Sequence, residues 1–178
     1  GAPPTRPYDT AGYTLAYQMG VKFDRLMEGF DGPFVEVREA ELPPEPQGFG
    51  WGARNAKGEV LTSGYFIDCR ANGSFAAVNR LLKNGVPVRR VTEPVKRFGR
   101  TLPPGAFYGA GDAAKVKLFA QIALELGVWF HPVEEEPRVA SVPVKHVRVG
   151  LWDKFGGSMP SGWTRLVLER FEFPFEVV

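Results

Sequence analysis

The apolar positions between residues 59 and 91 follow the order strand, helix, strand. Val60–Asp68 is rich in β-branched and aromatic residues, which predicts a strand. Asn72 is placed to cap the helix that follows, and Asn84-Gly85 to end it. The next strand is expected at Val86–Val91. The helix is expected to turn these residues toward a core, since they are three or four apart: Phe75, Val78, Leu81 and Leu82.

A second succession of the same order begins near Arg100. Arg100–Tyr108 is expected to form a hairpin around the Pro103-Pro104-Gly105 turn. Asp112 is a candidate N-cap for a long helix that ends at Gly127, and a strand begins at Val128–Phe130. The buried face of this helix is predicted to consist of Val116, Phe119, Ala120, Ala123 and Leu126. Two such halves indicate a weak internal repeat.

The last stretch, Val147–Val178, has the pattern of one further βαβ unit. Alternating apolar residues open it, and a break rich in glycine with Met159 and Pro160 follows. Ser161 is the expected N-cap of a helix before a final strand, Phe173–Val178. The apolar face of this helix is predicted to hold Trp163, Leu166, Val167 and Phe171. Because one βαβ unit cannot bury both of its faces, the chain is expected to be cut inside a larger protein.

These patterns predict an α/β fold in which repeated βαβ units form a mostly parallel or mixed sheet. The alternative is a ferredoxin-like split βαβ arrangement with an extra βα unit. The predicted division is a helix and proline-rich extended segment over 1–58, an α/β domain over 59–142, and the final unit over 143–178.

The remaining segments are expected to be irregular or short. The first 58 residues are predicted to contain a helix over Tyr8–Met19 and strands near Val21–Phe23 and Phe34–Val37. The segment 41–52 is predicted to be a loop that Phe49 and Trp51 pin to the body of the domain. Residues 134–146 are predicted to be a connection.

Composition narrows the function only a little. The 178 residues are 44% hydrophobic and 24% charged, which is typical of a soluble globular protein. A formal net charge of +2 gives no case for a nucleic-acid partner, and no apolar run is long enough to insert into a membrane. Cys69 is the one cysteine, so no internal disulfide is possible.

Three stretches, residues 6–21, 64–88 and 151–178, resemble a bacterial group of carboxypeptidase-A-like zinc peptidases. In that group they lie downstream of the catalytic domain, and the last stretch opens a class I glutamine-amidotransferase-like domain. The resemblance implies a non-catalytic accessory or regulatory region whose partner is the catalytic domain of its own parent chain. It also implies no cofactor here, with zinc confined to the absent peptidase domain, and a secreted or periplasmic location.

The sequence contains one short match to a zinc-ligand pattern and one candidate nucleophile. His131 and Glu134 match the short His-x-x-Glu pattern, but His146 lies too near for the long separation in that family. His131 is therefore interpreted as a strand-end residue. Cys69 stands between a strand and a helix, as an amidotransferase nucleophile does, yet it lacks the glycines of a strained elbow. It is interpreted as a small buried apolar residue, and a hydrolase built on Cys69 is the least favoured function.

The glycine-rich break before the last helix is the remaining candidate site. Backbone N–H groups at a helix start bind anions, so the loop over 152–161 favours an alternative function as a small-molecule-binding domain. The residues of this candidate site are Trp152, Lys154, Ser158, Trp163 and Arg165. The acidic run 134–136 is interpreted as a solvated turn.

Overall fold

The computed structural model describes residues 23–36, 50, 52–97 and 99–178 of the chain, which divides into two compact units, Gly1–Ala40 and Glu41–Val178. The described part of the first unit, 23–36, contains neither helix nor strand. The strands predicted around Phe23 and Phe34 are therefore wrong over those residues. The predicted helix over 8–19 and the contacts of Phe49 and Trp51 lie outside the described residues.

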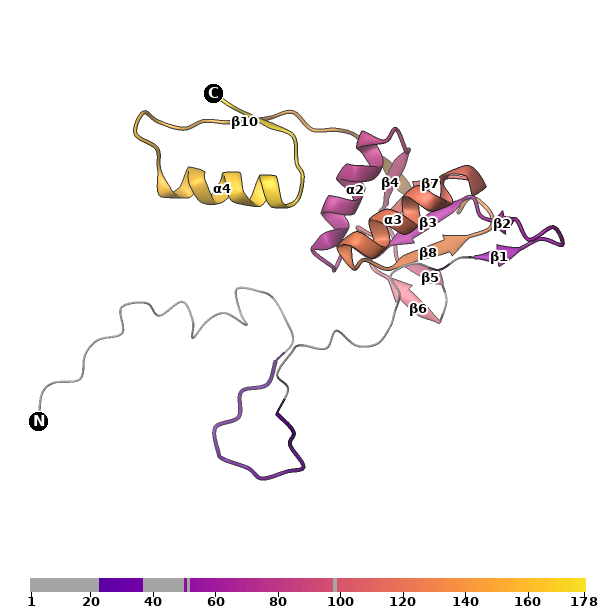
Figure 1. Ribbon diagram of the computed structural model, residues 1–178, viewed down its shortest axis with the longest axis horizontal. Helices are drawn as coiled ribbons and strands as arrows, with labels where there is room; N and C mark the ends of the chain where they lie inside the picture. The colour runs from indigo at the N-terminus through magenta and orange to yellow at the C-terminus, as the bar shows by residue number, and fades with distance from the viewer. Residues whose placement is uncertain (1–22, 37–49, 51, 98) are drawn as a thin grey trace, which may run out of the picture. The chain divides into compact units, whose positions relative to one another are not determined.

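Five strands of the second unit form one sheet in the order β8-β3-β7-β4-β9 (Figure 1). Helix α2 connects β3 to β4, and helix α3, preceded by the short 3-10 helix η2, connects β7 to β8. The bounds are β3 Gly64–Ile67, α2 Gly73–Lys83, β4 Val88–Val91, β7 Phe107–Ala110, η2 Ala113–Lys115, α3 Val116–Leu126, β8 Phe130–Val133 and β9 Ser141–Val144.

Every pairing within this sheet is antiparallel. Strands β3 and β4 run in the same direction with β7 between them, and β7 and β8 do so with β3 between them. The two βαβ units are thus interleaved, which is the ferredoxin-like split arrangement with β9 as a fifth strand. The α/β class is confirmed, and the mostly parallel sheet is wrong in favour of the antiparallel alternative.

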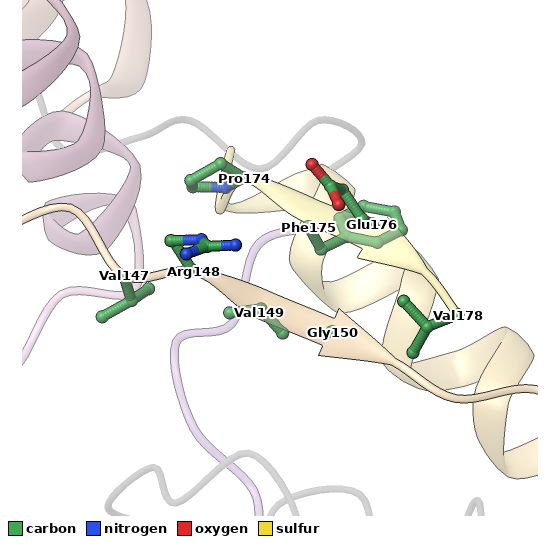
Figure 2. Close-up of a pocket in the computed structure, with 8 residues that line it drawn as sticks. All are labelled: Val147, Arg148, Val149, Gly150, Pro174, Phe175, Glu176 and Val178. Atoms are coloured by element: carbon green, nitrogen blue, oxygen red, sulfur yellow. The ribbon is translucent and has the colours of Figure 1, made fainter.

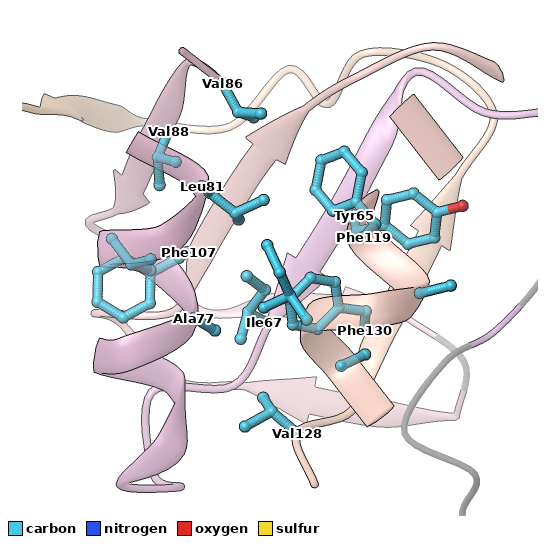
Figure 3. Close-up of a cluster of buried hydrophobic side chains, with 14 of the residues drawn as sticks. Tyr65, Ile67, Ala77, Leu81, Val86, Val88, Phe107, Phe119, Val128 and Phe130 are labelled. Atoms are coloured by element: carbon cyan, nitrogen blue, oxygen red, sulfur yellow. The ribbon is translucent and has the colours of Figure 1, made fainter. Parts of the chain in front are cut away.

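Helices α2 and α3 cover one face of the sheet, where aromatic side chains form the centre of the core (Figure 3). The Tyr65 ring lies 4.7 Å from the Phe119 ring and 6.3 Å from the Phe130 ring. The predicted core residues that are buried are Val78, Leu81, Val116, Phe119, Ala120 and Ala123. Phe75 differs, since 39% of it is exposed, and Leu82 and Leu126 are partly buried at the margin.

A hairpin between β4 and β7 covers the opposite face of the sheet. Its strands, β5 Val95–Arg97 and β6 Arg100–Leu102, pair with each other and not with the main sheet. Val95 and Leu102 pack there against Phe66, Tyr108 and Val133. The hairpin predicted across 100–108 is therefore wrong, because the Pro103-Pro104-Gly105 turn passes between two sheets.

Helix ends agree with sequence signals where a side chain reaches the backbone. Asp112 Oδ1 accepts a hydrogen bond from Ala114 N at 3.1 Å and caps the turn before α3. Gly127 ends α3 in the left-handed conformation, with φ of 62°, which suits glycine. Asn72 precedes α2 but makes no side-chain cap; Ser74 Oγ instead donates to the Asp68 carbonyl at 2.6 Å.

The two outer strands of the sheet each contain a proline, Pro132 in β8 and Pro143 in β9. Strand β9 lies within 134–146, so the prediction that this segment is only a connection is wrong. A further short hairpin joins β1, Ala53–Arg54, to β2, Val60–Leu61. We call residues 60–144 the core domain.

Residues 147–178, which we call the C-terminal unit, form the expected strand, helix and strand. Strand β10, Val149–Leu151, precedes helix α4, Met159–Arg170, in the chain, and strand β11, Phe175–Val177, follows it. The two strands pair in parallel, as the pattern predicted. The helix begins earlier than expected: Ser158 is its N-cap, and Pro160 fits within the first turn, where its missing N–H costs nothing. No helix among the described residues is long and apolar enough to cross a membrane.

Candidate functional site

The five residues of the predicted loop site lie along the C-terminal unit. Trp152 and Lys154 follow β10, Ser158 caps α4, and Trp163 and Arg165 lie on the helix. Both tryptophans are exposed. Arg165 Nε donates to Glu169 Oε1 at 2.8 Å, one turn along the helix. The cavities described below are lined by other residues.

The Ser158 and Ser161 hydroxyl groups at the start of α4 form hydrogen bonds within the chain. Ser158 Oγ accepts a hydrogen bond from Ser161 N at 3.2 Å and donates to Ser161 Oγ at 2.8 Å. Ser161 Oγ lies 2.7 Å from Asp153 Oδ1, to which it donates. The Asp153 carboxylate therefore lies near the helix N-terminus, where it interacts favourably with the helix dipole. A bound anion would have to approach this carboxylate.

Helix α4 exposes a continuous apolar stripe instead of burying it. Met159, Trp163, Leu166 and Val167 fall on one face at helical spacing, and each is between 48% and 79% exposed. The sequence predicted an apolar face of Trp163, Leu166 and Val167 together with Phe171, which is partly buried. Phe155, in the loop before the helix, is fully exposed. The helix therefore presents to solvent the surface that amphipathic helices normally place against a core.

The sheet of the C-terminal unit carries a hollow of about 420 Å³ (Figure 2). It is lined by β10 and β11 and by the residues that flank them, among which Arg148 and Glu176 supply opposite charges. Phe175 pairs with Val149 across the two strands. The lining residues are Val147, Arg148, Val149, Gly150, Pro174, Phe175, Glu176 and Val178. Sequence spacing predicted the strands but gave no signal for this open surface.

Polar contacts join the C-terminal unit to the core domain at the turn that follows α4. Asn79 Nδ2 on α2 donates to the Phe171 carbonyl at 2.8 Å. Arg80 donates to Glu172 at 2.7 to 3.0 Å and to Glu125 of α3 at 2.5 Å. Arg80 therefore connects α2, α3 and the end of α4, and these contacts are polar.

Cys69 lies partly buried at the end of β3, against the margin of the core. Its Sγ lies 3.9 Å from the Pro104 carbonyl. Burial, and then the neighbouring Asp68 carboxylate, raise the pKa of the thiol above its usual value. A nucleophilic cysteine needs the opposite shift, because the thiolate is the reactive form.

His131 is buried on β8, on the sheet face opposite the helices. Burial is the main cause that lowers its pKa to about 4, and Arg100 lowers it further, whereas Asp68 opposes the shift. Glu134 and His146 are exposed. Within the described residues, no group of three or more His, Cys, Asp or Glu side chains is arranged to hold a metal ion.

Comparison with known proteins gave no match: no protein-family model, no curated protein and no solved structure is similar to the chain at a significant level.

Proposed function

We propose that this chain is a non-catalytic accessory region that packs against a neighbouring protein domain through its C-terminal unit. The partner we propose is the catalytic domain of a carboxypeptidase-like zinc peptidase in the parent protein, as the sequence resemblance implies. The observation that carries the proposal is the exposed apolar stripe of α4, formed by Met159, Trp163, Leu166 and Val167.

The energetics favour covering this surface. Apolar area removed from water contributes roughly 25 cal/mol per Å², and large exposed apolar patches mark interaction sites. A two-stranded sheet is also marginal by itself, and parallel sheets are normally covered on both faces. A folded domain that packs on α4 and on the β10–β11 sheet satisfies both requirements.

A binding measurement tests the docking surface. The full chain and the separately expressed peptidase domain of the parent protein would be titrated against each other by calorimetry. We expect Leu166→Glu to weaken binding by more than roughly tenfold, because it places a charge in a buried interface. Leu124→Glu is the matched control, since Leu124 is an exposed leucine on α3. Equal affinity for the two variants, or no binding by the native chain, contradicts the proposal.

An activity measurement tests the non-catalytic role. The isolated chain, supplied with zinc, would be incubated with peptides whose C-terminal residue is released by carboxypeptidases. We expect no release above the rate without protein. Turnover that disappears when His131 is replaced by Gln would assign a zinc site to this chain and overturn the proposal.

A further inference from the structure

A groove of about 430 Å³ lies on the helix-covered face of the core domain, between α2 and β9. The groove forms because the fifth strand of the sheet, β9, extends past helix α2. Helix α2 packs on β4 and β7, whereas β9 extends the sheet beyond β4. Val144 pairs with Val88, whose side chain is in the helix-side core, so Val142 and Val144 face the same side. Val142 remains 42% exposed.

The walls of the groove are mostly apolar. Phe75, Val78 and Leu82 come from α2, Phe107, Val142 and Val144 come from the sheet, and Val147 and Phe173 come from the C-terminal unit. The Phe75 ring meets the Phe107 ring edge to face, with centroids 6.0 Å apart. This packing explains why Phe75 is only half covered: its other side faces the groove.

Two cations border this apolar surface. Arg90 on β4 pairs with Phe107 on one side and with Val142 on the other, which places it on the groove face of the sheet. Lys145 follows β9 directly, and both residues line the groove. Neither forms an ion pair within the described part of the chain, and the groove lining contains no Asp or Glu.

We infer that this groove binds a small amphipathic carboxylate, whose alkyl or aryl body lies between α2 and β9 and whose carboxylate meets Arg90 and Lys145. The volume is in the range of small-molecule pockets, which combine apolar walls with a few polar groups. A guanidinium matches a carboxylate with two parallel hydrogen bonds. Apolar walls also lower the local dielectric constant and strengthen the attraction between the charges. None of the four residues of the α4 stripe lines the groove, so this inference does not depend on the proposed function.

The test uses octanoate as the probe, with octanol and octylamine as matched compounds that keep the chain and change the head group. The full chain would be titrated below the micellar range and followed by backbone amide NMR. We expect saturable octanoate shifts at Leu82 and Val142, with octanol and octylamine at least roughly tenfold weaker, since a charge-assisted hydrogen bond contributes about 1.5 kcal/mol or more. Equal binding of octanoate and octanol overturns the inference, as do shifts confined to α4.

Variants assign the head group to its cations. Arg90→Gln and Lys145→Gln are each expected to weaken octanoate binding by about tenfold and to leave octanol binding unchanged. Lys96→Gln removes an exposed cation of β5 and is the matched control. Arg90→Lys keeps the charge and should retain part of the affinity if Arg90→Gln fails to fold. Unchanged octanoate affinity in Lys145→Gln and in either folded Arg90 variant overturns the assignment.

Discussion

The core domain and the C-terminal unit are built from the same pattern, yet they bury their apolar residues very differently. All the buried Val, Ile, Leu, Phe, Tyr and Ala side chains of the described residues lie between Tyr65 and Val133. In the C-terminal unit the one buried residue is Ser161. The core domain interleaves two βαβ units, so each helix covers strands of both. Helical spacing therefore predicts an amphipathic element, but whether that element is covered depends on what packs against it.

The sheet edges of the two regions also differ, because only those of the core domain contain prolines. In the core domain both outer strands contain a proline, Pro132 or Pro143, and a proline in an outer strand limits pairing with another chain. Strands β10 and β11 contain none. Prolines thus protect the sheet edges of the core domain. The C-terminal unit has an exposed apolar helix, and its two strands have no such protection. This contrast supports the proposal that the C-terminal unit carries a docking surface.

The largest expected effect is on stability when equivalent aromatic residues are truncated in the two regions. Phe119→Ala should lower the free energy of unfolding by about 3–5 kcal/mol, because it leaves a cavity beside Tyr65 and Phe130. Trp163→Ala should change it by less than about 0.5 kcal/mol, since Trp163 is exposed. Urea unfolding followed by circular dichroism measures both. A large loss in Trp163→Ala would mean that α4 is covered in solution.

A smaller effect is expected from the pH dependence of the core domain. His131 has a pKa of about 4 in the folded chain, against about 6.5 in the unfolded chain. The unfolded state therefore binds more protons between these values, and stability that is complete above pH 6.5 is lost as the pH falls toward 4. We expect a loss of about 2–3 kcal/mol across this window. His131→Gln should remove this part of the pH dependence, and an unchanged profile would contradict it.

The comparison also explains which parts of the fold could be predicted from the sequence. The Asp112 cap and the Gly127 stop depend on neighbours in the sequence, and both predictions are confirmed. Sheet order depends on distant segments: α2 and α3 each connect two strands that run in the same direction, but another strand lies between them, whereas the strands joined by α4 pair directly. The sequence pattern of a βαβ unit is the same whether its two strands pair directly or have another strand between them. The strand β9 was not predicted within 134–146, and it forms by pairing with β4 at the edge of the sheet, where Pro143 is tolerated.

The candidate site was predictable only in part. Trp152 directly follows β10, as the pattern predicted, but Ser158 is the N-cap of α4, a role that the pattern gave to Ser161. The hydrogen bond from Ser161 Oγ to Asp153 could not be predicted, because it depends on how the loop between them folds. The groove was missed because Arg90 and Lys145 are unremarkable cations in the sequence. The pairing of β4 with β9 is what brings these two cations to the same groove.

A more modest effect is expected at the contact that joins the two regions. Arg80→Ala removes the bonds to Glu172 that join the two regions, and both groups are partly exposed, so we expect about 1 kcal/mol of weaker attachment of the C-terminal unit. Faster hydrogen exchange in β11 would report this opening. Arg165→Ala is the control, because Arg165 pairs only along α4 with Glu169. Equal exchange in the two variants would show that Arg80 does not hold the unit.

The smallest expected effect is on the rate of thiol alkylation, compared between one cysteine in each region. At pH 7.5 Cys69 should react with iodoacetamide more slowly than the same thiol in the urea-unfolded chain, because burial and Asp68 raise its pKa and reduce the thiolate. A cysteine introduced by Val167→Cys in a Cys69→Ser background should react several-fold faster than Cys69, since that position is 51% exposed on α4. Mass spectrometry over time gives both rates. If Cys69 reacted faster than the introduced cysteine, it would be an activated thiol, and a hydrolase built on Cys69 would replace the accessory role.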